Sequence, residues 1–128
     1  MNKLDTLRLK QYSHESKAWE RLLYFFKQEN VFLKTRLSEV LDNRNDTELL
    51  VSAEYFQNHF ILKDELIDKL LQEIHDQEKD WKENFINNRP VPYKKQLDKK
   101  ERLRAQMQDF KENFREIEIE FNKYVISI

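Results

Sequence analysis

The chain has 128 residues, with 23 basic and 24 acidic side chains, two Pro, and neither Gly nor Cys. The lack of Gly and Cys excludes Gly-rich phosphate-binding loops, the GxSxG turn of hydrolases, disulfides, Cys-ligated zinc and catalytic thiols. The net charge of −1 gives no overall attraction to nucleic acid or anionic lipid. We expect a single domain over residues 1–128 whose partners are recognised by shape and apolar surface.

The first predicted helix covers residues 3–42. Its apolar residues recur at helical spacing from Trp19 to Leu41 and form one face. Asn30 falls on that face, where a buried amide commonly fixes the register of packed helices. The sequence therefore predicts a polar contact inside an otherwise apolar helix interface.

A polar cluster at residues 42–46 predicts the turn to the second helix. Asn43 is expected to cap the end of the first helix. Asn45, which is followed three positions later by Glu48, is expected to begin the second helix as part of a capping box. The second predicted helix then covers residues 46–87.

Pro90 and Pro92 predict an extended connector after the second helix, because two prolines so close together prevent a helix from continuing. The third predicted helix covers residues 93–126. Its apolar seam advances in alternating steps of four and three, as in a coiled coil: Leu103, Met107, Phe110, Phe114, Ile117, Phe121 and Tyr124. Three segments of similar length predict an all-α fold, an antiparallel up-down-up bundle of three long helices with coiled-coil-like packing.

Two short connections also predict the register of the bundle. If each connection reverses the chain, Asn30 lies opposite Phe60, and Phe60 lies opposite Phe121. Residues 4–16 would then cover the end of the second helix that carries Trp81 and Phe85. Few apolar residues are available there, so we expect this end to be the looser one.

Histidine and carboxylate spacing gives no indication of a metal or catalytic site. His14, His59 and His75 are never three or four positions apart, and the paired Glu-x-x-His pattern of helical di-iron proteins is missing. No histidine has an orienting partner that the sequence identifies. We therefore expect no catalytic residue, no bound metal, no cofactor and no enzymatic activity.

Residues 89–104 form the most basic stretch of the chain, with seven basic and two acidic residues. The predicted register places it opposite Asp76, Glu78, Asp80 and Glu83 of the second helix. Pairing between oppositely charged helix flanks explains both runs of charge. The alternative is a nucleic-acid surface, which is disfavoured because Tyr93 is the only aromatic residue of the stretch that could stack on a base.

Some apolar residues point away from the predicted core faces. They are Tyr24, Phe25, Val31, Phe32, Val51, Tyr55, Leu62, Leu66, Ile119 and Ile126. The register places them toward one end of the bundle, in one or two patches larger than those that monomers usually expose. We interpret them as a candidate interaction surface, with a homodimer as the first expectation and a helical partner protein as the alternative.

The segments from Trp19 to Leu41 and from Glu54 to Leu62 resemble short, uncharacterised bacterial coiled-coil and helical-bundle proteins. That resemblance implies no activity, cofactor or site residue. The three-helix plan is also similar to spectrin-type repeats, which carry a Trp in their first helix as Trp19 does here, but there is no second repeat. Frequent residues with A/T-rich codons favour a bacterial source.

The longest apolar run, Leu22 to Phe26, is far too short to span a membrane, and the first residues lack an apolar signal segment. We therefore expect a cytoplasmic protein with no membrane association. The leading hypothesis is a non-enzymatic helical scaffold, adaptor or self-assembling interaction module. The alternatives are a small nucleic-acid-associated protein that uses residues 89–104 and, less favoured, a metal-dependent helical enzyme.

Overall fold

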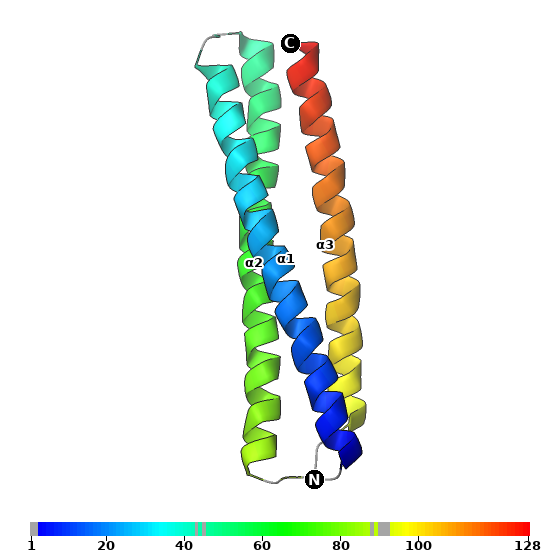
Figure 1. Ribbon diagram of the computed structural model, residues 1–128. Helices are drawn as coiled ribbons and strands as arrows, with labels where there is room; N and C mark the ends of the chain where they lie inside the picture. Colours follow the sequence, from blue (N-terminus) through cyan, green and yellow to red (C-terminus); the bar gives the residue numbers. More distant parts are fainter. Residues whose placement is uncertain (1–2, 43, 45, 88, 90–92) are drawn as a thin grey trace.

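A computed structural model describes residues 3–42, 44, 46–87, 89 and 93–128 (Figure 1). It contains three helices: α1 (Lys3–Leu41), α2 (Thr47–Ile86) and α3 (Tyr93–Ser127). No strand occurs within those described ranges. The predicted all-α three-helix bundle is confirmed, and each helix boundary lies within one residue of the predicted one.

The first connection differs in detail from the prediction. Asp46 caps the N-terminus of α2, since its side chain accepts a hydrogen bond from the Glu48 backbone N–H at 3.1 Å. The cap is therefore one residue later than expected. Asn43 and Asn45, to which the prediction gave the capping roles, and the connector residues Pro90 and Pro92 lie outside the described residues.

The core follows the predicted seam of α3. Leu103, Met107, Phe110, Phe114, Ile117 and Phe121 are all buried, with apolar residues of α1 and α2 packed around them. Phe26 of α1 contacts Phe110 and Phe114, with ring centroids 5.4 and 4.8 Å apart. Full burial of one such side chain is worth roughly 1.5–3 kcal/mol, so the continuous seam is the main apolar contribution to stability.

The predicted register is confirmed at both helix pairs. The Asn30 side-chain amide is fully buried and donates to the Phe60 carbonyl oxygen at 2.8 Å, which joins α1 to α2. The rings of Phe60 and Phe121 lie 5.2 Å apart across α2 and α3. Asn30 therefore has the register-fixing position that its place in the sequence predicted.

Helix α1 runs obliquely across the other two helices (Figure 1). Its N-terminal part is joined to α3 by a hydrogen bond between Ser16 and Lys100. Its C-terminal half is joined to α2 by Lys34, which contacts Asp64. A groove lies between α1 and α3, which run in the same direction, and is lined by residues between 22 and 29 of α1 and between 111 and 119 of α3.

Candidate functional site

The ten predicted surface residues are all exposed, with exposed fractions from 42% for Leu66 to 85% for Ile126. They are distributed over three flanks of the bundle instead of one or two patches. Residues seven positions apart share a helix face. The flank occupied by one of these ten residues therefore also gives the flank of the residue seven positions away. The three flanks differ in depth and charge.

The flank between α1 and α3 carries a groove of about 400 Å³. Its floor includes the buried rings of Phe26 and Phe114, and its rims include Phe25 and Ile119, which are about half exposed. Phe32 and Ile126 lie one heptad beyond Phe25 and Ile119, on the same faces of their helices. Two of the ten predicted residues therefore border this groove, which we call the α1–α3 groove, and two more continue the same helix faces beyond it.

Charged residues also line the α1–α3 groove: Glu29, Lys111, Arg115 and Glu118. Burial raises the pKa of the Glu118 carboxyl, the nearby Glu29 raises it further, and Arg115 partly opposes both. A half-buried carboxylate beside another carboxylate gains free energy when a cation approaches. The groove is therefore apolar at its centre, with charges of both signs along its length.

The other two flanks hold the remaining six residues. Tyr24 lines a groove between α1 and α2 beside Asp68 and Leu71, and Val31 follows it on the same face. The Tyr55 hydroxyl donates to Glu120 at 3.0 Å across α2 and α3. The same face of α2 also carries Val51, Leu62 and Leu66.

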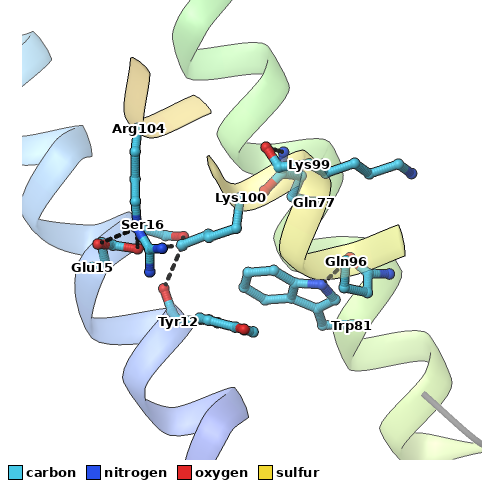
Figure 2. A network of polar contacts seen from close by, with 9 residues as sticks. All are labelled: Tyr12, Glu15, Ser16, Gln77, Trp81, Gln96, Lys99, Lys100 and Arg104. Atoms are coloured by element: carbon cyan, nitrogen blue, oxygen red, sulfur yellow. Dashed lines mark hydrogen bonds and ion pairs between the residues drawn. The ribbon is translucent and has the colours of Figure 1, made fainter. Parts of the chain in front are cut away.

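A buried lysine, which the sequence did not single out, forms the centre of a second cluster between the three helices (Figure 2). Lys100 is fully buried, and three aromatic rings surround its ammonium group. The Nζ atom lies 4.5 Å from the ring centroid of Trp19, 4.9 Å from that of Trp81 and 5.3 Å from that of Tyr12. These rings come from α1 and α2, so one α3 side chain contacts both other helices.

Three oxygen atoms complete the surroundings of the Lys100 ammonium (Figure 2). It donates to the Tyr12 carbonyl oxygen and the Ser16 hydroxyl, both at 3.0 Å, and lies 3.4 Å from Glu15 Oε1. An ammonium has three N–H donors and no acceptor, so this set of oxygens matches the protonated form. Burial lowers the pKa of Lys100, and Arg104 lowers it further, while Glu15 opposes both.

The residues around Lys100 are held by their own partners. The Trp81 indole N–H donates to Gln96 Oε1, and the Gln96 amide donates to Asp80 at 2.9 Å. Arg104 Nε lies 3.0 and 3.1 Å from the two carboxylate oxygens of Glu15. With no solvent exposure and all three donors occupied, Lys100 is held as a structural cation that joins the three helices.

The sequence does contain a signal that Lys100 is buried. Continuing the four-three seam of α3 backward from Leu103 leads first to Lys100 and then to Gln96, and both are buried. Sequence reasoning instead assigned Lys100 to the basic stretch, because a lysine is almost never fully buried unless it is paired. The helical periodicity indicates the burial of Lys100 correctly, whereas its residue type does not.

The basic stretch pairs differently from the prediction. Lys100 and Arg104 form their ion pairs with Glu15 of α1 instead of with the acidic residues of α2. Lys99 and Arg102 do share a groove with α2 acids, in this case Glu73 and Asp76. The charge complementarity of the helix flanks therefore involves both neighbouring helices.

The end that was predicted to be looser is only partly so. Leu4 and Leu7 are about half exposed, and an apolar pocket of about 310 Å³ lies between the N-terminal part of α1 and the C-terminal part of α2. Trp81, however, is buried and packs against Tyr12, with ring centroids 4.9 Å apart. The Lys100 cluster thus orders this end where apolar residues are few.

Two further features concern metals and membranes. Among the residues that the structure describes, no three His, Asp or Glu side chains gather in a way that could hold a metal ion. Within the same residues, no helix combines the length and apolar character needed to cross a bilayer.

Comparison with protein-family models, with curated proteins and with solved structures finds no match to this chain.

Proposed function

We propose that the protein is a non-enzymatic helical interaction module that self-associates through the α1–α3 groove. The observation that carries this proposal is the pairing of two exposed rims with a buried aromatic floor: Phe25 and Ile119 stand on either side of Phe26 and Phe114. Apolar side chains in this arrangement are typical of the centre of a protein–protein interface. We place this role in the bacterial cytoplasm.

The free energy gained by covering exposed apolar side chains is similar in size to the cost of association, which supports a weak dimer. Four apolar residues in each copy are half exposed or more: Phe25 and Ile119 on the rims, and Phe32 and Ile126 one heptad beyond them on the same helix faces. If covering each one contributes about 1 kcal/mol or slightly more, a dimer gains roughly 8–12 kcal/mol from eight side chains. Association costs roughly 4–15 kcal/mol, so we expect a dimer whose population depends on protein concentration.

The nucleic-acid alternative has less support. Two of the seven basic residues in the stretch 89–104 are engaged inside the bundle, since Lys100 is fully buried and Arg104 pairs with Glu15. Lys99 and Arg102 lie beside carboxylates of α2. Phosphate groups would have to compete with these contacts, which weakens any gain from counterion release.

The test is a pair of double variants on opposite flanks of α1. The variant Phe25→Glu/Ile119→Glu places charge in the α1–α3 groove. The control Tyr24→Glu/Val31→Glu alters two residues of nearly equal exposure, 57% and 54% against 53% and 54%. We expect sedimentation equilibrium at roughly 100 μM to give a dimer for the wild type and the control, and a monomer for the groove variant.

Circular dichroism on each variant separates loss of association from loss of fold. A folded, monomeric groove variant beside a dimeric control supports the proposal. A wild type that is monomeric at this concentration overturns self-association. Equal dissociation of both variants shows that the α1–α3 groove is not the interface.

A further inference from the structure

The α1–α3 groove has a symmetry that bears on how a second copy is seated. Phe25 and Phe32 are seven residues apart on one face of α1, and Lys111 and Glu118 are seven residues apart on one face of α3. Phe26 packs between Phe110 and Phe114, which sets the two helices at the same level. The midpoint of the Phe pair on α1 is therefore level with the midpoint of the Lys–Glu pair on α3.

From this juxtaposition we infer that the occupant of the α1–α3 groove is a second copy of the chain, packed antiparallel about a two-fold axis at the shared midpoint. The inference rests on the proposed self-association and adds its geometry. One axis places Phe25 opposite the second copy's Phe32 on the α1 side. The same axis places Lys111 opposite the second copy's Glu118 on the α3 side, and symmetry repeats both contacts.

The Lys111–Glu118 contacts favour this orientation, while the same axis brings Glu29 near the second copy's Glu29 and Arg115 near the second copy's Arg115, with these opposite charges level across the groove. Glu118 is half buried and shares the groove with Glu29 of its own chain. In the antiparallel arrangement, Lys111 of the second copy adds a second cation near this carboxylate, which has Arg115 of its own chain nearby. A close pair of opposite charges at an interface fixes register as well as adding affinity.

Charge over the whole bundle favours the same orientation. The half that holds the N-terminal part of α1 consists, among the described residues, of 3–22, 70–87, 89 and 93–107, and carries 14 basic and 10 acidic residues. The other half, described residues 23–42, 44, 46–69 and 108–128, carries 9 basic and 14 acidic residues. Antiparallel packing sets the positive half of one copy beside the negative half of the other, whereas parallel packing sets like halves together.

The orientation is measured with a spin label. The chain has no Cys, so Lys94→Cys on an exposed position near the connector gives a single labelling site. In an antiparallel dimer the two labels are separated by about 40 residues of helical rise, or about 60 Å. In a parallel dimer they lie side by side, about 20–30 Å apart, as two neighbouring bundles of this diameter require.

The register is measured by charge exchange. We expect Lys111→Glu and Glu118→Lys each to weaken dimerisation about three- to tenfold, and the double exchange to restore most of the affinity, because the pair is rebuilt with its signs reversed. Lys95→Glu, which alters an exposed α3 lysine about 160° around the helix from Lys111, is the matched control.

Each outcome distinguishes the inference from the proposed function. A long label distance together with rescue by the double exchange supports the antiparallel dimer. A short label distance, or no rescue, overturns it while leaving self-association through the groove in place. A wild type without any dimer overturns both, and leaves a different partner as the occupant of the groove.

Discussion

At Lys100, burial and hydrogen bonding act on one ammonium group in opposite directions. Removing a cation from water costs several kcal/mol, and the lowered pKa of Lys100 reflects that cost. Three oxygen acceptors, the Glu15 charge and three aromatic rings offset part of it. The result is a polar contact that fixes the position of α3 relative to α1. It lowers the free energy of unfolding, because the cost of burial is only partly offset.

Replacing Lys100 with Met tests this balance through its pH dependence. The lowered pKa lies below the ordinary lysine value of 10.5, so between these two values the unfolded chain binds more protons than the folded one. Wild-type stability therefore rises with pH across that interval. We expect Lys100→Met to be up to about 2 kcal/mol more stable than the wild type at pH 7, and this advantage to shrink as the pH approaches 10.5.

Urea unfolding at a series of pH values measures the difference between the two proteins. Lys94→Met, which removes an exposed lysine from the same helix, is the control and should show no such trend. An advantage of Lys100→Met that grows with pH would contradict the account of a buried, protonated amine.

Asn30 is the second residue that fixes the register. Its amide nitrogen donates to Phe60 and to Asp64, both at 2.8 Å, while its Oδ1 atom is buried with no partner among the described residues. Burial alone raises the pKa of Asp64, but hydrogen bonds from Lys34 and Asn30 outweigh it, so the pKa is lowered. The charged contacts of Asp64 therefore contribute fully to the stability of the fold above the ordinary Asp pKa of 3.8. This contribution is lost as the pH falls through the lowered pKa of Asp64.

At the scale of the elements, α3 is the helix whose seam organises the bundle. Its buried residues continue in steps of four and three from Gln96 to Phe121 and contact both other helices. The aromatic residues dominate these contacts: Phe114 packs against Phe26 and Phe110, and Phe121 against Phe56 and Phe60. Long helices of this kind gain most of their stability from such packing and little from propensity alone.

Phe114→Ala is therefore expected to be among the costliest single changes. The side chain is 1% exposed, and its removal leaves a cavity between α1 and α3 that the long helices close only partly. We expect a loss of about 3–5 kcal/mol in the free energy of unfolding, measured by chemical denaturation. A loss below about 1 kcal/mol would show that the seam is not the centre of the core.

At the scale of the whole molecule, stability is unevenly distributed along the bundle. The first two turns of α1 carry half-exposed Leu4 and Leu7, and Leu9 lines an apolar pocket, while the middle of α1 carries the buried residues Leu23, Leu33 and Leu37. Elements with few buried apolar contacts open more readily than those in the core.

Native-state hydrogen exchange provides the measurement. We expect backbone amides of residues 4–11 to exchange at least tenfold faster than those of residues 23–37, since the former open locally and the latter open only with the core. The amides around Ser16 should be protected, because Lys100 holds that turn against α3. Uniform protection along α1 would show that the bundle opens as one unit.

The helices, their boundaries, the seam of α3 and the register at Asn30 followed from the sequence, because they depend on local properties. Apolar residues repeat with the period of the helix, polar clusters and prolines mark the ends, and two short connections leave one way to pair the seams. The placement of Asp46 as the cap was missed by one residue, since Asn and Asp are nearly equal as caps.

Only the tertiary structure decided which flank each exposed residue occupies and what surrounds Lys100. Tyr24 and Phe25 are adjacent in sequence, yet they line grooves on opposite sides of α1. The burial of Lys100 depends on rings that α1 and α2 bring together from positions far apart in the chain. Periodicity states that a position faces inward, but the partners that make a buried charge tolerable are supplied by the packing of all three helices.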